Sequence, residues 1–280
     1  MKVVIKKNEE FNKIKEKIKQ DGFSRPHILV DFDRTLTYGA IDGVKTVSIM
    51  ALLRDGNHLT PDYAEKSYEL FNKNHVAEIN PDISLFKKKK IMQKWWSDHN
   101  ELLIKSGLKK DDLKDIAINS HLKLRAGVPD FLKFLDDNNV PVVIISASGC
   151  GEAIELFLEK NNCNFKNIYY LVNRFSWDKN GRAISTLGPI IHSFNKDETI
   201  LQDFPDIYNN IKDRKNVLLL GDSLGDLGMI DGFKYDNLLT FGFLNFDYNS
   251  NIDEYIEKFN VVLAGDGDFS FLNNLLIDWS

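Results

Sequence analysis

Short, uninterrupted apolar runs alternate along the chain with stretches in which apolar residues recur every three or four positions. Three of the runs are each followed at once by a small or acidic polar residue, and they cover 27–30, 140–145 and 217–220. Runs of this kind are typical of strands buried on both faces, as in a parallel sheet. Because open α/β sheets bind ligands beyond the carboxyl ends of their strands, we expect these three ends to meet at one site.

The segment between the first two runs has few strand patterns and many helical ones. One helix is expected to begin at Thr60-Pro61, with one face carrying Ala64, Tyr68 and Phe71. Helical spacing returns over 84–104 and 110–124. We therefore predict a helical cap domain, residues 41–121, inserted into an α/β core made of residues 1–40 and 122–280.

Further elements are expected on both sides of this insertion. Helical spacing covers 11–19, 151–160 and 251–259, and strand patterns cover 168–173, 182–187, 237–243 and 261–264. The turn at 178–181, Asp-Lys-Asn-Gly, predicts that the strands at 168–173 and 182–187 form a hairpin.

Composition narrows the class of protein. The 280 residues are 43% hydrophobic and 28% charged, which is typical of a globular protein of one or two domains. Lys and Arg number 36 against 41 Asp and Glu, and this net charge of −5 lacks the basic field that nucleic-acid polymers usually need. Cys150 and Cys163 cannot build a disulfide framework, and no apolar run reaches the roughly 20 residues of a membrane span. We expect a cytoplasmic monomer without membrane or nucleic-acid partners.

The most informative motif is Asp31-Phe-Asp33, directly after the first apolar run. One carboxylate at such a strand end can attack a phosphorus atom while the other handles the proton of the leaving group. A carboxylate is repelled by a phosphate dianion, so a divalent cation has to screen the pair. By itself the motif is equally consistent with an Asp-rich turn after a strand.

Groups farther along the chain fit this chemistry. Asp222 and Asp226, interleaved with Gly and Ser, suit Mg²⁺, which prefers carboxylate and water oxygens; the alternative is a turn with acidic helix caps. Ser146 begins a Ser-Ala-Ser-Gly stretch that offers a hydroxyl and backbone N–H groups to phosphate oxygens. Lys196 could supply the buried cation that neutralises charge at phosphorus, although an isolated lysine is more often a surface residue.

In their order and spacing, these four motifs resemble the haloacid dehalogenase superfamily of Mg²⁺-dependent phosphotransferases. The resemblance implies an α/β fold with a Rossmann-like parallel-sheet core and a helical cap inserted after the first catalytic strand. It makes Asp31 the nucleophile that forms an aspartyl-phosphate, and Asp33 the general acid that later becomes the base. Ser146 would bind phosphoryl oxygens, and Lys196 would stabilise the nucleophile and the transferring group.

The same resemblance implies a metal site. Asp222 would hold Mg²⁺ together with Asp31 and the backbone carbonyl of Asp33. Asp226 would support the metal, either as a ligand or through the groups around it. The acid at Asp33 favours phosphatases and phosphomutases over the dehalogenases of the superfamily.

Longer stretches are similar to the cytosolic pyrimidine 5′-nucleotidase family (type III), most specifically residues 192–196, His-Ser-Phe-Asn-Lys, and 221–227, Gly-Asp-Ser-Leu-Gly-Asp-Leu. This similarity implies that the substrate is a nucleoside 5′-monophosphate of the pyrimidine or 7-methylguanosine type, which the enzyme hydrolyses. It also implies that Ser146 and Ala147 hold the phosphate together with Lys196.

In that family the helical insertion closes over the nucleoside. By position, Glu78 would bond the base or sugar, Trp96 would stack on the base, and His99 stands where the family has a substrate-contacting serine. Trp95 and Trp96 cannot share one helix face, so we expect Trp95 in the core and Trp96 in the cleft. Glu78 also fits a helix-end acid, and His99 a surface histidine.

Departures from the family leave the substrate partly open. Arg34 replaces an apolar residue, and residues 148–151 differ from the usual turn, but every charged catalytic group remains. The changes in the cap leave the base preference undetermined. An alternative is a phosphatase or phosphomutase for a non-nucleotide monoester, such as a sugar phosphate or phosphoserine. The lysines at 87–90 fit either a solvated helix face or a positive rim that attracts phosphate.

Overall fold

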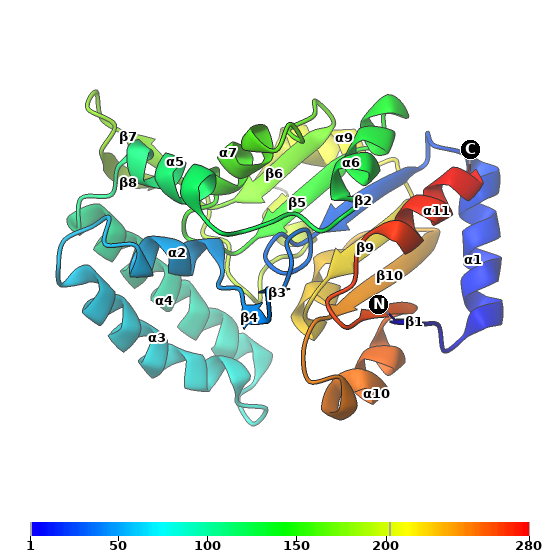
Figure 1. Ribbon diagram of the computed structural model, residues 1–280, viewed down its shortest axis with the longest axis horizontal. Helices are drawn as coiled ribbons and strands as arrows, with labels where there is room; N and C mark the ends of the chain where they lie inside the picture. Colours follow the sequence, from blue (N-terminus) through cyan, green and yellow to red (C-terminus); the bar gives the residue numbers. More distant parts are fainter. Residues whose placement is uncertain (1, 202, 280) are drawn as a thin grey trace.

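The computed structural model of the chain describes residues 2–201 and 203–279. At its centre lies a seven-stranded sheet in the order β1-β11-β10-β9-β2-β5-β6 (Figure 1). The strands are β1 (Lys2–Val4), β2 (Pro26–Val30), β5 (Val142–Ser146), β6 (Ile168–Val172), β9 (Asn216–Gly221), β10 (Asn237–Leu244) and β11 (Val261–Ala264). Neighbouring strands are parallel except β1, which pairs antiparallel with β11. The predicted α/β class with a parallel sheet is confirmed.

The three strands that precede the polar motifs lie side by side at the centre of this sheet. β2 lies between β9 and β5, and Val30 pairs with Leu220 on one side and with Ile144 on the other. Every residue of these strands is buried, which explains their continuous rather than alternating apolar sequences. Because the strands are parallel, their carboxyl ends lie on the same edge of the sheet.

Helices cover both faces of the sheet. One face packs against α1 (Asn8–Asp21), α6 (Val128–Asp137), α7 (Glu152–Lys160) and α11 (Ser270–Trp279). The other packs against α8 (Glu198–Leu201), α9 (Pro205–Ile211) and α10 (Tyr248–Lys258), and the short helix η1 (Leu224–Ile230) follows β9. Within the described part of the chain, no helix is long and apolar enough to cross a membrane.

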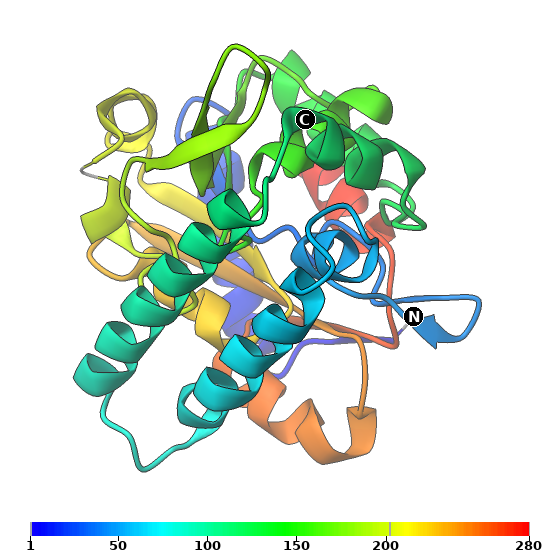
Figure 2. The same ribbon diagram turned by 90° about the vertical axis from the view of Figure 1, so that its left-hand side faces the viewer.

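A second group of helices forms the cap. It contains α2 (Ile49–Asp55), α3 (Tyr63–Ile79), α4 (Leu85–Lys105) and α5 (Lys110–Asn119), preceded by the small hairpin β3 (Ala40–Ile41) and β4 (Val44–Lys45). Helices α3 and α4 form a long pair beside the sheet (Figures 1 and 2). Helix α5 packs instead on α7 and ends at residue 119, short of the predicted 124, and Leu124 forms an isolated antiparallel bridge with Thr37. The domain boundaries at residues 41 and 122 stay a prediction.

The start of α3 differs from the expectation. The helix begins at Tyr63, and its buried residues are Tyr63 and Ser67. Tyr68 and Phe71, on the apolar face seen in the sequence, are 43% and 37% exposed. Phe71 remains partly exposed because it lines a cavity rather than a closed core.

The predicted hairpin is half wrong. Strand β6 is not part of it but pairs in parallel with β5 in the main sheet. The hairpin consists of β7 (Arg174–Trp177) and β8 (Ala183–Leu187), around the predicted turn at 178–181. The apolar segment at 168–172 is drawn into the sheet because three of its residues, Ile168, Leu171 and Val172, can be buried there.

Candidate active site

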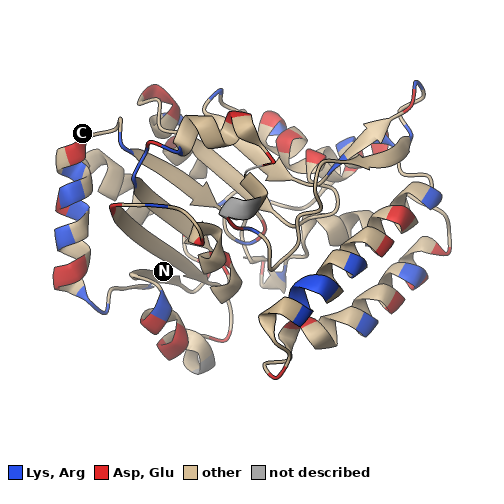
Figure 3. Ribbon diagram, turned by 180° about the vertical axis from the view of Figure 1, so that it is seen from behind, with Lys and Arg blue, Asp and Glu red and all other residues tan. Residues whose placement is uncertain are grey.

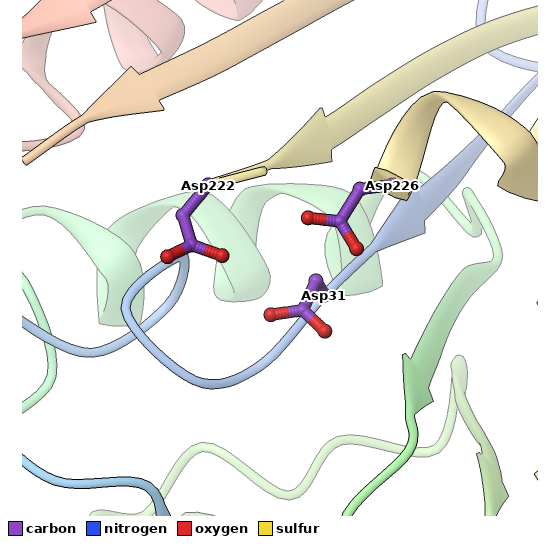
Figure 4. A group of neighbouring side chains, drawn as sticks. All are labelled: Asp31, Asp222 and Asp226. Carbon is purple, nitrogen blue, oxygen red and sulfur yellow. The ribbon is translucent and has the colours of Figure 1, made fainter. Parts of the chain in front are cut away.

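Three carboxylates from two distant parts of the chain point toward one another at the carboxyl edge of the sheet (Figure 4). Asp31 follows β2, Asp222 follows β9, and Asp226 lies on η1. One oxygen from each carboxylate lies within 4.8 Å of the others. Asp226 can come this close because Gly221 has no side chain: a Cβ there would lie 2.4 Å from the Cβ of Asp226.

Lys196 lies against this group and is only 8% exposed, so it is not a surface lysine. Its Nζ donates to Asp31 Oδ1 at 2.6 Å and to Asp226 Oδ1 at 3.1 Å. Burial acts to lower the pKa of Lys196, but the two carboxylates outweigh it and raise the pKa overall. The ammonium therefore stays charged beside Asp31.

The carboxylates themselves carry an excess of negative charge. Burial raises the pKa of Asp31 to about 7, with Lys196 opposing the shift, and raises that of Asp222 well above its usual value. Three carboxylate oxygens so close together are the hard donors that a divalent cation such as Mg²⁺ prefers, so the residues fit a metal. The carbonyl oxygen of Asp33 accepts no hydrogen bond from the described residues, which leaves it able to join these ligands.

Asp33 faces the other way, toward the cap. Its Oδ1 accepts a hydrogen bond of 2.9 Å from the backbone N–H of Ile49, at the start of α2. Burial raises the pKa of Asp33, while this N–H and the Arg34 guanidinium oppose the shift. A carboxyl with a raised pKa is suited to give and take a proton.

Arg125 supports the loop that carries both acids, a role that the motifs in the sequence do not reveal. Its side chain is fully buried. The guanidinium donates to three backbone carbonyls and two side chains, those of Arg34, Thr35, Gly267, Asp266 and Asn245. Arg34 has a left-handed φ of 62°, and the bond to its carbonyl stabilises that turn. The stretch Arg125-Ala-Gly127 matches the nucleotidase family in sequence, but that match gave Arg125 no role.

Ser146, the last residue of β5, and Ala147, which follows it, are the residues expected to bind phosphate. Ser146 is 2% exposed, and its Oγ accepts a hydrogen bond of 3.1 Å from the backbone N–H of Ser148. Asn173, which lies outside every motif, holds the loop from the core: its Nδ2 donates to the carbonyl of Ser148 at 3.1 Å. In the sequence it is the last residue of the strand predicted over 168–173, which gave it no role.

A cavity of about 320 Å³ opens between the cap and the catalytic loop. The cap contributes Phe71, Glu78, Trp95, Trp96 and His99 to its walls, among others. The core contributes Asp33, Ala147, Ser148, Gly149 and Ser193. The predicted cap residues therefore share one cavity with Asp33, whereas Ser146 and Lys196 are not among its lining residues.

The polar groups of this cavity are held by neighbours on the cap. His99 Nε2 lies 3.0 Å from the Tyr63 hydroxyl and 3.4 Å from the Ser67 hydroxyl. Burial lowers the pKa of His99 to about 4, so the ring is neutral near pH 7 and is not a surface histidine. Glu78 Oε2 lies 2.9 Å from His75 Nδ1. Tyr63 and Ser67 were not recognised from the sequence.

Two side chains of this cavity connect the cap directly to the core. Trp96 Nε1–H donates to the carbonyl oxygen of Ala147 at 2.6 Å, and the Ser193 hydroxyl donates to Glu78 Oε1 at 2.7 Å. Trp95 is buried, as expected, but it also lines the cavity beside Trp96, so both indoles reach the cleft and not Trp96 alone.

The lysine run at 87–90 contributes a third connection. Lys and Arg colour several turns of the cap helices in Figure 3. Lys89 Nζ lies 2.9 Å from Asp197 Oδ2, next in the chain to Lys196, and Lys88 donates to the carbonyl of Glu78 at 2.7 Å. Two of the four lysines are therefore engaged, rather than forming a purely solvated face.

A larger cavity of about 1100 Å³ lies elsewhere, beneath the β3–β4 hairpin. Its lining mixes apolar residues with polar and charged ones of both signs, and Asp31, Asp33, Asp222 and Asp226 are not among them. The smaller cavity is the better candidate for the substrate, because it reaches Asp33.

Comparisons with known proteins agree with this geometry. The sequence model of the family described as pyrimidine 5′-nucleotidase (UMPH-1) matches residues 34–278, beginning just after Asp33. The 7-methylguanosine phosphate-specific 5′-nucleotidase of Gallus gallus is 30% identical over 260 residues, 92% of this chain and 89% of that protein. The human protein of the same name is 28% identical over 260 residues, 92% of this chain and 86% of that protein.

Solved structures share the fold. A cytosolic 5′-nucleotidase IIIB bound to cytidine has a TM-score of 0.88 at 24% identity, covering 99% of this chain and 94% of that chain. A phosphoserine phosphohydrolase-like protein from Francisella tularensis has a TM-score of 0.52 at 15% identity, covering 89% and 99%.

These matches extend over nearly the whole chain and include both the cap and the catalytic core. They make this protein an enzyme of the 5′-nucleotidase class, a phosphoric monoester hydrolase. The chain belongs to the pyrimidine 5′-nucleotidase (UMPH-1) family.

Proposed function

We propose that the enzyme removes the 5′-phosphate from nucleoside monophosphates of the pyrimidine or 7-methylguanosine type, with Mg²⁺ and through an aspartyl-phosphate. One observation carries the proposal: an aromatic cavity in the cap ends at Asp33, and Asp31 beside it is paired with buried Lys196. The cavity accommodates a flat base, and the carboxylates and lysine act on a phosphate.

The reaction has two displacement steps on the chain's own residues. A carboxylate oxygen of Asp31 attacks phosphorus, the bond from phosphorus to the 5′-oxygen breaks, and Asp33 gives its proton to that oxygen as the nucleoside leaves. Asp33 then takes a proton from water, whose oxygen attacks the aspartyl-phosphate and releases inorganic phosphate. Asp31 is thereby regenerated.

The remaining charges support these steps. Lys196 stabilises the charge on the phosphoryl oxygens and holds Asp31 at 2.6 Å. Mg²⁺, held by Asp31, Asp222 and the Asp33 carbonyl with Asp226 beside them, would screen the repulsion between nucleophile and phosphate. Ser146 and Ala147 would bind phosphoryl oxygens.

Substrate recognition is assigned to the cap. Trp96 would provide an aromatic wall for the base, and Glu78 and His99 would bond its polar edge or the sugar. The relatives support this assignment, because two are named for 7-methylguanosine phosphate and one structure for bound cytidine.

A substrate panel tests the proposal. The full chain is incubated with UMP, CMP and 7-methyl-GMP, and with ribose 5-phosphate and phosphoserine as base-free comparisons, with Mg²⁺ or with a chelator. Phosphate release should require Mg²⁺ and be fastest for a nucleotide. Turnover of ribose 5-phosphate or phosphoserine without any nucleotide would contradict the proposal and favour the non-nucleotide phosphatase.

We further propose that the enzyme is a cytoplasmic monomer whose substrate is a small molecule, not a nucleic-acid polymer, and whose residues 41–121 act as the cap. A structural neighbour that is named cytosolic supports the location. Size-exclusion chromatography with light scattering should give the mass of one chain, about 32.2 kDa.

A further inference from the structure

The hydrogen bond from Trp96 to Ala147 does more than join two domains. The acceptor is a backbone carbonyl in the phosphate-binding loop, and the distance of 2.6 Å makes it one of the shortest contacts between cap and core. Trp96 is therefore bonded to the loop that follows β5, in addition to lining the cavity.

The bonded carbonyl belongs to the peptide unit between Ala147 and Ser148. A peptide unit is planar and trans, so its C=O and N–H point in opposite directions and turn together. The carbonyl points to the cap, and the N–H of Ser148 donates to Ser146 Oγ at 3.1 Å. Because this N–H occupies a lone pair of Oγ, the hydroxyl proton of Ser146 remains available to a phosphoryl oxygen.

The core holds the same peptide less firmly. Asn173 Nδ2 lies 3.4 Å from the Ala147 carbonyl oxygen, at the outer limit of a hydrogen bond. Its shorter hydrogen bonds go to the carbonyls of Ser148 and Ile191. The direction of the Ala147 carbonyl is therefore set mainly by the cap.

We propose that Trp96 is a positioning residue for the Ser146 hydroxyl, acting through the Ala147–Ser148 peptide. The cap thereby contributes to the geometry of the proposed phosphate cradle through one side chain. The inference rests on the proposed role of Ser146 in binding phosphate, but it does not depend on which base the cap accepts. Trp96 acts on phosphate affinity and turnover, not only on the base.

The test uses Trp96→Phe, which keeps an aromatic ring at this wall but removes the N–H donor together with part of the indole; the matched Trp→Phe control carries the same loss of ring size. The substrate is p-nitrophenyl phosphate, which has no nucleobase, and orthovanadate is the inhibitor that occupies the phosphate cradle alone. We expect kcat to fall about fivefold and the Ki of orthovanadate to rise about fivefold, as for the loss of one hydrogen bond. The matched control is Trp177→Phe. It removes the hydrogen bond from the indole of Trp177, in strand β7, to Glu152 on α7, and it should leave kcat and the Ki of orthovanadate unchanged.

A double-mutant cycle with Ser146→Ala shows whether Trp96 acts through Ser146 or has an effect of its own. If Trp96 acts through Ser146, the double variant loses no more activity than Ser146→Ala alone. Additive losses, or a Trp96→Phe defect confined to nucleotides, would overturn the inference. Thermal unfolding checks each variant, and Ser146→Cys replaces Ser146→Ala if the latter does not fold.

The outcomes also distinguish this inference from the proposed function. Turnover of p-nitrophenyl phosphate but of no nucleotide would refute the nucleotidase proposal and leave the Trp96 result decisive. Absence of turnover with every monoester would overturn both.

Discussion

The catalytic cluster of the core and the cavity of the cap are built in opposite ways. In the core, Asp31, Lys196 and Asp226 hold one another at hydrogen-bond distance, and Arg125 holds the loop behind them with bonds to five different residues. The cavity of the cap has aromatic walls, and isolated bonds such as that of Trp96 to Ala147 connect it to the core. The difference teaches that the proposed chemical groups are held by many mutual contacts, whereas the proposed recognition groups depend on a few contacts between cap and core.

The strongest test of this contrast is Asp31→Asn. Because an amide is a far weaker nucleophile, kcat should fall about a thousandfold or more for every phosphate monoester, whatever its leaving group. Phosphate release is measured for a nucleotide and for p-nitrophenyl phosphate, with circular dichroism as the check on folding. A loss restricted to nucleotides would contradict the division between core and cap.

The next test affects the cap alone. Glu78→Gln keeps the shape of the side chain but removes its charge, so KM for the preferred nucleotide should rise about tenfold while p-nitrophenyl phosphate is hydrolysed as before. Glu65→Gln, an exposed glutamate on the same helix α3, is the matched control. Equal losses on both substrates would assign Glu78 to the chemistry instead.

A smaller effect concerns the stability of the core cluster without metal. Burial and the neighbouring carboxylates raise the pKa of Asp222 in the folded state. The free energy of unfolding therefore decreases as the pH rises from about 4, the pKa of an unfolded aspartate, through the raised pKa of the folded state. At pH 7.5, Asp222→Asn should raise Tm of the metal-free protein by a few degrees. This corresponds to a gain of about 1 kcal/mol or more in the free energy of unfolding. Differential scanning calorimetry with and without Mg²⁺ measures this.

The same calorimetry provides the control. Mg²⁺ should raise Tm of the wild type and have less effect on Asp222→Asn, since the cation relieves the same repulsion. Asp253→Asn, at an exposed position on α10, should behave as the wild type in both conditions. A metal-free Asp222→Asn protein that melts below the wild type would show that Asp222 stabilises the fold.

The smallest effect is expected at the connection outside the cavity. Lys89→Ala removes the ion pair with Asp197, and because the lysine side chain is 40% exposed, kcat/KM should fall only about twofold. Lys94→Ala removes an ion pair of the same length within α4 and is the matched control. If both variants lose activity equally, the contact with the core has no special role.

The sequence predicted the catalytic edge better than the cap. Strands β2, β5 and β9 were found because burial on both faces leaves an unbroken apolar run, a local signal. The hairpin partner was misassigned because a strand's length and composition do not say which neighbour it pairs with. The face of α3 was misjudged because an apolar residue at a cavity looks the same in sequence as one in a core.

The supporting residues were harder to find for a related reason. Arg125 and Asn173 act through backbone carbonyls, and Tyr63 and Ser67 act through His99. None of these partners is close in sequence, and a carbonyl has no residue-specific signature. Such contacts exist only after the chain has folded.

From its residues alone, the chain already specified a parallel α/β sheet, the carboxylates at its edge and a helical insertion, because these depend on local runs and short motifs. Folding added the rest: Lys196 between two carboxylates, Asp33 turned toward the cap, and a tryptophan of the cap bonded to the loop after β5. These depend on distances between segments up to 165 residues apart in the chain, such as Asp31 and Lys196, which no local pattern encodes.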